Sequence, residues 1–219
     1  LQPVMVENQS SLPLWAQPGV TWVDGRLQRM AALLEEMRSH INALQMNTPV
    51  GWSAWKELAL AWAELSSLRF HADLAVPSAV QQGYSKVARD LEGLFTLWLK
   101  KHYPALGAQR LPTPHHVHHI PHYLAHLRNL GKVEKVVLLV LDGLSLMDWQ
   151  TVSAAWAQRH EDWKIKTEVV LSQIPTITSI SRYALISGLR PADFAGDIAQ
   201  RVSEARAWEL FWSREGVTE

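Results

Sequence analysis

The stretch Glu134–Gly143, EKVVLLVLDG, decides the fold class that we expect for this chain. Its middle part, Val136–Leu141, is an unbroken run of aliphatic residues, and Asp142 and Gly143 follow directly. Strands that are covered on both faces have such continuous apolar runs, whereas half-exposed strands alternate between apolar and polar residues. The stretch therefore predicts a buried strand of a parallel sheet that ends at Asp142.

The residues after this strand predict further elements in alternation. Helical patterns cover residues 149–160 and 178–187, and residues 164–171 are Val-rich and alternate like a second strand. A last helical pattern runs from Asp193 to Trp212. Strand, helix, strand and helix in this order predict an α/β fold class with a mainly parallel sheet. Two strands cannot complete such a sheet, so either more chain follows or the missing strands are borrowed from elsewhere.

The first part of the chain is helical in pattern. From Asp24, apolar residues recur three and four positions apart, which places them on one helix face. These residues are Leu27, Met30, Leu34, Met37, Ile41 and Leu44. Two similar amphipathic patterns begin near Ser53 and after Pro77, and three such helices predict an antiparallel bundle over residues 1–110. Prolines and a glycine then mark a linker, and residues 111–219 form the second predicted domain.

The composition excludes several classes of chemistry. The chain has no Cys, which removes disulfides, thiolate metal sites and Cys nucleophiles. Lys plus Arg equals Asp plus Glu at 21 each, so the bulk charge favours neither nucleic acid nor a membrane surface as a partner. No apolar run is long enough for a membrane span, and no signal peptide is recognisable, so we expect a soluble cytoplasmic protein. Because Leu1 stands where an initiator Met would, we also expect a cut-out or processed piece.

Asp142 lies at the carboxyl end of the predicted buried strand. Open α/β sheets place their ligand sites at this edge. A carboxylate in such a position costs desolvation free energy unless a cation binds it, and a metal ion is a common partner. The alternative is a structural role, because Asp-Gly is also a favoured pair in turns.

A second group of polar residues follows the second predicted strand. The segment Ile174–Arg182, IPTITSISR, carries four hydroxyl side chains where a helix is expected to begin. Free backbone N–H groups at a helix N-terminus favour an anion such as phosphate. A Thr hydroxyl is a weak nucleophile and needs a base or a metal that lowers its pKa. The alternative is again structural, because Thr and Ser are preferred helix caps.

Both segments resemble parts of one enzyme superfamily. Val136–Gly143 is similar to the first strand and metal-binding aspartate of alkaline phosphatase superfamily enzymes, and Ile174–Pro191 resembles their nucleophile loop. The run PTITSISR looks most like PglZ proteins of bacterial phage-exclusion (BREX) systems, and PHHVHHIPHYL at residues 114–124 is also similar to that family. The similarity is tight over residues 134–191 and looser over residues 111–133. It covers the N-terminal part of an alkaline-phosphatase-like PglZ core.

The resemblance implies a metal-dependent phosphatase or phosphodiesterase. It makes Asp142 a metal ligand, and it makes Thr178 both the nucleophile and a second ligand of the same ion. The ion would be Zn²⁺, with Mn²⁺ and Mg²⁺ as alternatives, and attack by Thr178 would give a phospho-threonine that water then cleaves. Related phosphodiesterases often have an Asn three residues after the nucleophile, where this chain has Ser181. Arg182 is the candidate that could hold phosphate oxygens instead, and the alternative is a surface Arg paired with an acid.

The rest of such a site is missing from these residues. The superfamily takes its remaining Asp and His ligands from later strands, but no His follows Pro191 here. We therefore expect this chain to carry half of the metal site and to be inactive, or nearly so, alone. The resemblance also implies anti-phage defence with other BREX proteins, including a DNA methyltransferase, and nucleic acid fits that context although the balanced charge does not support it. The alternative is a non-enzymatic scaffold that docks partners in the same defence system.

Six histidines fall within twelve residues between His115 and His126. His118, His122 and His126 would share one face of a continuous helix, at a spacing that can bind Zn²⁺ or Cu²⁺. Pro121 is expected to interrupt that helix, so that a short helix begins only at His122. The alternative, which we favour, is a set of surface polar residues that bind metals only non-specifically.

Overall fold

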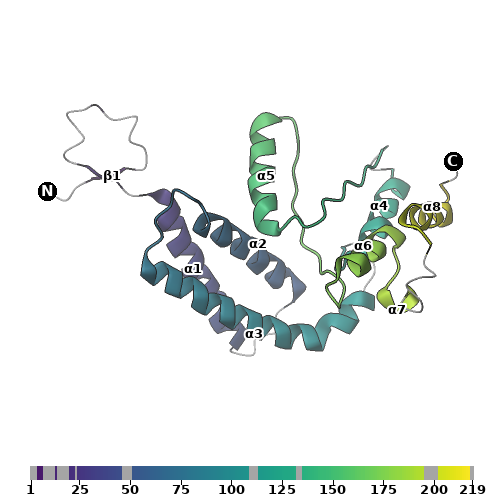
Figure 1. Cartoon of the computed structure of the whole chain (residues 1–219), viewed down its shortest axis with the longest axis horizontal. Coiled ribbons are helices and arrows are strands. Elements are labelled where there is room, and N and C mark those ends of the chain that lie inside the picture. The colour runs from purple at the N-terminus through teal and green to yellow at the C-terminus, as the bar shows by residue number, and fades with distance from the viewer. Residues whose placement is uncertain are drawn as a thin grey trace. The chain divides into compact units, whose positions relative to one another are not determined.

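The structure is a computed structural model, and it describes residues 4–6, 13, 20–22, 24–45, 51–108, 113–131, 135–194 and 202–217. These residues contain eight helices and two short strands (Figure 1). The strands are β1 (Val4–Val6) and β2 (Val20–Trp22), which pair in parallel with Val4 opposite Val20. The helices are α1 (Gly25–Gln45), α2 (Trp52–Arg69), α3 (Ser78–Ala108), α4 (His119–Asn129), α5 (Leu146–Arg159), α6 (Thr178–Ser187), α7 (Pro191–Phe194) and α8 (Glu204–Arg214).

The chain divides into two compact units. The first comprises Leu1–Leu97 and Ser145–Lys166, and the second comprises Trp98–Leu144 and Thr167–Glu219. Helix α5 therefore belongs to the same unit as α1 and α2, although it follows them by many residues, and α3 contributes to both units. The predicted domain boundary near residue 110 stays a prediction.

In the first unit, α2 packs against both α1 and α5. The face of α1 that the sequence spacing predicts is buried, and it includes Met30, Leu34, Met37 and Ile41. On α2, the buried ring of Trp55 lies 5.0 Å from the ring of Phe95 on α3. The ring of Trp62 stacks on that of Tyr84 at 4.4 Å. The three amphipathic helices that the sequence predicts in this region are confirmed.

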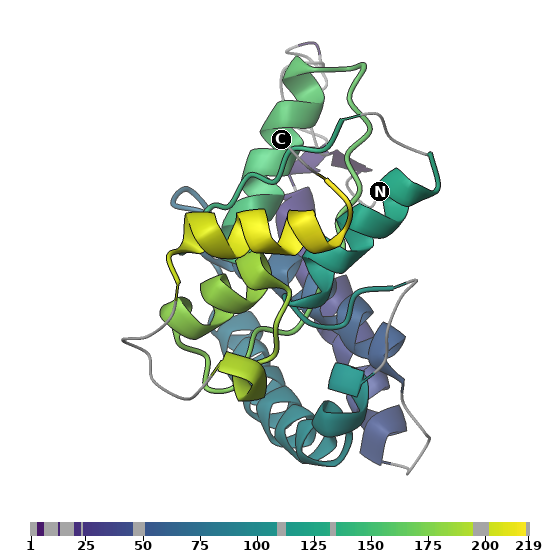
Figure 2. The same cartoon turned by 90° about the vertical axis from the view of Figure 1, so that its right-hand side faces the viewer.

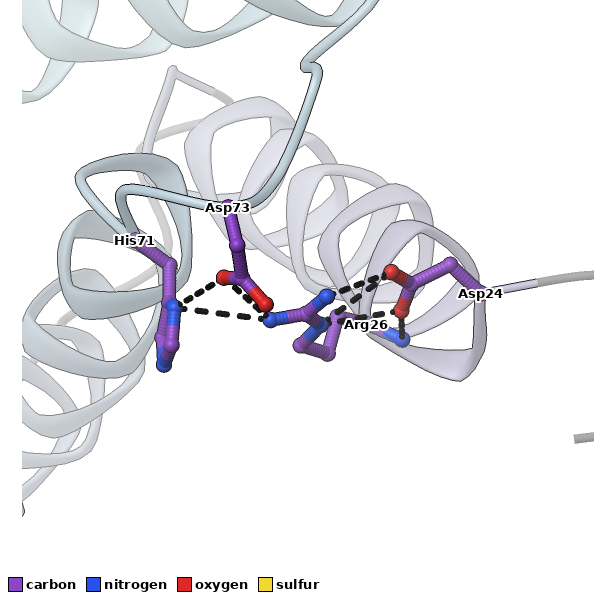
Figure 3. Close-up of polar contacts among 4 residues, drawn as sticks. All are labelled: Asp24, Arg26, His71 and Asp73. Atoms are coloured by element: carbon purple, nitrogen blue, oxygen red, sulfur yellow. Dashed lines mark hydrogen bonds and ion pairs between the residues drawn. The ribbon is translucent and has the colours of Figure 1, made fainter. Parts of the chain in front are cut away.

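An exposed ionic group joins the start of α1 to the connection between α2 and α3 (Figure 3). Arg26 donates from Nη2 to Asp24 at 2.7 Å and from Nη1 to Asp73 at 2.9 Å. His71 also contacts the Asp73 carboxylate. Arg26 first and His71 second lower the pKa of Asp73 to about 2. Ion pairs between such exposed side chains contribute little stability.

In the second unit, α6 packs against α8 and α4, and α8 lies across α6 (Figure 2). Tyr183 and Ala184 of α6 and Phe211 of α8 are buried. Gly188 ends α6 in the left-handed region, with a φ of +68°. Its carbonyl contacts His122 Nε2 of α4 at 2.9 Å. The end of α6 is therefore tightly enclosed by both neighbouring helices.

Gly188→Ala is expected to destabilise the second unit by about 2–4 kcal/mol. An alanine is strained at a positive φ, and its Cβ would overlap with neighbouring atoms. The added Cβ would lie 2.8 Å from the Phe211 ring and 2.9 Å from His122 Nε2. Gly131→Ala is the matched control, because Gly131 has a similar φ of +65° and nothing within 4 Å of an added Cβ. Its expected cost is only about 1 kcal/mol. Chemical denaturation followed by circular dichroism measures both variants, and equal losses would contradict the steric argument.

The parallel sheet that the sequence predicts for residues 111–219 is not formed. Val136–Leu141 has no regular secondary structure, and no strand is present in the part of 111–219 that the structure describes. The segment is also not buried, since Val137 is 89% exposed and Leu139 is 69% exposed. The predicted α/β fold class with an alkaline-phosphatase-like sheet is therefore wrong, and the described residues are mainly helical.

The second predicted strand, residues 164–171, forms a single parallel bridge between Leu171 and His116. Leu171 N donates to His115 O at 2.8 Å, and Val117 N donates to Leu171 O at 3.0 Å. The two predicted strands thus do not pair with each other. The backbone N–H and C=O groups of a strand form their hydrogen bonds with neighbouring strands. An apolar run therefore predicts burial, but it does not specify which segment lies beside it.

The helices predicted in the later part of the chain agree better with the structure. Helix α6 spans the predicted helix 178–187, and α5 covers most of the predicted helix 149–160. Helices α7 and α8 lie at the two ends of the predicted helix 193–212, and residues 195–201 lie outside the described residues. Within the described chain, no helix is both long and apolar enough to cross a bilayer.

Candidate functional site

Helix α6 begins at Thr178, and its first turn leaves backbone donors free. The residue before it, Ile177, is the N-cap and has no side chain that accepts a hydrogen bond. Its carbonyl accepts from the N–H groups of Ile180 and Ser181, both at 3.0 Å. The N–H groups of Thr178 and Ser179 have no hydrogen-bond partner among the described residues. Thr178 is therefore not a cap, and a helix start with free donors at the positive end of its dipole favours an anion.

Buried polar contacts fix the loop before α6. The backbone N–H of buried Gln173 donates to Ser181 Oγ at 3.1 Å. Its side-chain amide contacts His118 Nδ1 at 2.8 Å, and Tyr103 Oη donates to Gln173 Oε1 at 3.4 Å. The same Tyr103 oxygen accepts from Ile174 N at 3.0 Å. The Ser181 hydroxyl, at the position where the resemblance would place a phosphate-binding Asn, is thus engaged in holding the loop.

Arg182 joins two acidic side chains on the exposed side of α6. Its Nε donates to Glu204 Oε1 at 2.7 Å, and its Nη1 donates to Asp142 Oδ2 at 3.3 Å. Glu204 first, and Asp142 less strongly, raise the pKa of the Arg182 guanidinium. All three side chains are partly exposed to solvent. Pairing with acids is the alternative that the sequence leaves open for Arg182, and the structure shows this pairing.

The ion pair brings Asp142 to the side of α6 that carries Thr178. Thr178 and Arg182 are four residues apart in one helix, so their side chains are neighbours on one face. Asp142 reaches Arg182 from 40 positions away in the sequence. Among the described residues, Thr178 and Asp142 form no hydrogen bond with each other. Arg182 contacts Asp142, and Thr178 precedes Arg182 by about one turn of the same helix.

Asp142 and Thr178 offer oxygen donors of the kind that a divalent cation binds. A zinc ion takes four ligands, and these two residues could supply at most two of them. Within the described residues, no group of three or more His, Asp or Glu side chains is arranged to hold a metal ion. The Asp142 carboxylate already binds a cation, the guanidinium of Arg182, which a metal ion would have to displace. A metal centre at this position therefore needs further ligands from other residues.

Three of the six histidines between His115 and His126 are buried, in contrast to the surface location that the sequence favours, and the other three are half-buried. His116, His118 and His119 are all buried, and His116 is only 1% exposed. The centroids of their rings lie 4.1–5.6 Å apart. His119 Nδ1 accepts from His115 N at 3.1 Å, and a turn closes where His119 N donates to His116 O at 3.0 Å. The rings thus form one packed group.

Burial keeps these imidazoles neutral. Burial first and His119 second lower the pKa of His116 to about 4, although the nearby Ser172 backbone opposes the shift. Burial and then the neighbouring histidines lower the pKa of His118 to about 3. Burial also lowers the pKa of His119. Neither ring nitrogen of His116 meets a partner at hydrogen-bonding geometry, so its ring packs as an apolar group would.

Helix α4 begins at His119, with Pro121 in its first turn, so the predicted interruption at Pro121 is wrong. Proline is tolerated there because the first N–H groups of a helix have no partner inside it. The metal-binding face of His118, His122 and His126, which we did not favour, has no support here, since no group of three or more metal-binding side chains occurs among the described residues. His118 contacts Gln173 and His122 contacts Gly188, so each ring has its own structural partner.

Comparison of the chain with known proteins finds no relative. No protein-family model, no curated protein and no solved structure matches it.

Proposed function

We propose that this chain supplies one half of a metal-dependent phosphoester hydrolase site of the PglZ type, acting as a phosphatase or phosphodiesterase. Thr178 is the nucleophile and also a metal ligand, and Asp142 is the second ligand of the same ion. Zn²⁺ is the proposed ion, with Mn²⁺ and Mg²⁺ as alternatives. The observation that carries the proposal is the Arg182–Asp142 ion pair, which holds a carboxylate on the Thr178 face of α6. The remaining ligands of the ion would come from residues other than these two.

The first turn of α6 supports the phosphoryl-transfer chemistry. The free N–H groups of Thr178 and Ser179 can donate to phosphoryl oxygens. Thr178 Oγ1 would give its proton to solvent and bond to phosphorus while the bond from phosphorus to the leaving oxygen breaks, and the leaving oxygen would take a proton from solvent. Water would then attack phosphorus and break its bond to Thr178 Oγ1, which restores the hydroxyl and releases phosphate or its monoester. A metal ion held by Asp142 and Thr178 would supply positive charge that lowers the pKa of the Thr178 hydroxyl and polarises a phosphoryl oxygen. Arg182 can turn to the phosphate, because its exposed ion pairs are weak.

The proposed setting is anti-phage defence in the cytoplasm. By resemblance, the protein works beside other BREX proteins, including a DNA methyltransferase. Nucleic acid is a partner that suits this setting, although the equal numbers of acidic and basic residues give it no electrostatic support.

The proposal is tested by hydrolysis of a chromogenic phosphodiester with added Zn²⁺ or Mn²⁺. The 219-residue chain is expected to show no turnover above background, because two ligands do not hold a zinc ion firmly. The protein translated from its complete reading frame is expected to hydrolyse the ester, and EDTA is expected to abolish that activity. A complete, folded and metal-loaded protein without activity would overturn the proposal.

A non-enzymatic scaffold is the second candidate, and one observation favours it. The apolar segment directly before Asp142 is exposed, as an interaction surface would be. Activity that needs both the metal and Thr178 would exclude a purely structural role for this site.

A further inference from the structure

Gln173 is a polar residue in the loop before α6, and it is only 2% exposed. It precedes Thr178, the proposed nucleophile, by five positions. Burying an amide costs desolvation free energy that an apolar side chain would avoid, so buried amides are hydrogen-bonded. The contacts of Gln173 reach Tyr103 in α3, His118 at the start of α4, and Ser181 in α6. One residue thus ties three helices to the loop that leads to Thr178.

The Tyr103 hydroxyl determines how the Gln173 side-chain amide is oriented. Tyr103 Oη accepts from Ile174 N at 3.0 Å, and it donates its own hydrogen to Gln173 Oε1 at 3.4 Å. The amide nitrogen of Gln173 therefore faces His118 Nδ1, at 2.8 Å. An amide NH₂ group can only donate, so His118 Nδ1 accepts. Because burial keeps the His118 ring neutral, its proton lies on Nε2.

We propose that Gln173 is a positioning residue for Thr178, an inference that rests on the proposed function. Its side chain is clamped between Tyr103 and His118, and its backbone N–H donates to Ser181 Oγ in the first turns of α6. The clamp therefore holds the loop and the helix start together. Any other loop conformation would leave a buried donor or acceptor without a partner, so the network selects one conformation.

NMR spectroscopy of the 219-residue chain tests the clamp without an assay of activity. Heteronuclear spectra of the histidine rings at pH 7 are expected to show the His118 proton on Nε2. Gln173→Met removes the amide donor and is expected to give a mixture of the two tautomers. In Tyr103→Phe, the Ile174 N–H loses its acceptor and is expected to exchange with solvent about five- to tenfold faster. A His118 proton on Nδ1 in the wild type, or unchanged exchange at Ile174 in Tyr103→Phe, would overturn the clamp.

Steady-state kinetics of the complete protein test the positioning role. Gln173→Met is expected to lower kcat for a chromogenic phosphodiester about 10–100-fold, because a displacement of about 1 Å at the nucleophile has an effect of this size. KM is expected to change less than about threefold, because Gln173 is buried and does not contact the substrate. Tyr103→Phe is expected to lower kcat in the same direction by a smaller factor. Gln150→Met is the matched control, because Gln150 Nε2 donates to Leu60 O at 2.9 Å in the first unit, and its kcat is expected to equal that of the wild type.

The outcomes separate this inference from the proposed function. A folded, metal-loaded wild-type protein without turnover would overturn the hydrolase and the role of Gln173 together. An active wild type, with kcat unchanged in Gln173→Met or with only KM raised, would overturn the positioning role alone. An equal loss of kcat in Gln150→Met would also overturn it, because the effect would then come from a general loss of packing. Circular dichroism checks the fold of each variant, and Tyr103→Phe decides the question if Gln173→Met does not fold.

Discussion

Thr178→Ala is expected to lower phosphoester hydrolysis by the complete protein by at least about 10³-fold, because it removes the atom that bonds to phosphorus. It also removes a proposed metal ligand at the start of α6. Alanine is the best helix former, so the helix itself should be retained. The measurement is kcat/KM for a chromogenic phosphodiester at fixed Zn²⁺, with circular dichroism to confirm the fold.

Two further variants separate the nucleophile from the rest of the loop. Thr178→Ser keeps a hydroxyl at the same position and is expected to retain measurable activity. Thr176→Ala changes a hydroxyl two residues earlier, which we assign to the shape of the loop, and it is expected to stay within about tenfold of the wild type. Activity that survives in Thr178→Ala, or a loss that is just as large in Thr176→Ala, would remove Thr178 from the role of nucleophile.

The parts of the structure that could be predicted from the sequence are those that local spacing determines. The buried face of α1 follows from residues three and four apart, because the helical period sets which side chains share a face. The start of α6 at Thr178 follows from the end of an apolar strand-like pattern and a run of hydroxyl residues. In both cases the prediction depends only on residues that are close together in the sequence.

The parts that could not be predicted depend on contacts between distant residues. Arg182 meets Asp142 from 40 positions away and Glu204 from 22 positions away, and no spacing rule connects them. Val136–Leu141 has the composition of a buried strand, but burial needs neighbouring strands, which the described chain does not provide. The sequence could identify the apolar run but not its partner.

The burial of three histidines also could not be predicted from the sequence, because it depends on contacts with distant residues. Their polar side chains indicate a surface, yet His116 is buried against Tyr103, with ring centroids 4.7 Å apart in an edge-on arrangement. The turn between His116 and His119 brings their rings close together. No pattern of spacing could show that Tyr103 of α3 packs against the His116 ring.

Lowering the pH from 7 to about 4 is expected to destabilise the second unit by about 3 kcal/mol through His116 alone, and by more with His118. Burial lowers the pKa of His116 to about 4 and that of His118 to about 3 in the folded chain. An unfolded histidine titrates near 6.5. Between that value and the folded pKa, the unfolded state binds more protons than the folded state. Stability is therefore fully present above about pH 6.5 and falls as the pH falls through this window.

His116→Phe is the variant that isolates this effect. Phenylalanine keeps an aromatic ring against Tyr103, removes two buried nitrogens that lack partners, and cannot take up a proton. The loss of unfolding free energy between pH 7 and pH 4 is expected to shrink by about 3 kcal/mol, measured by urea denaturation at each pH. The difference between pH values is the deciding quantity, because a change in packing alone would shift stability equally at both. An unaltered pH dependence in His116→Phe would mean that protonation of this buried ring does not limit the acid stability of the fold.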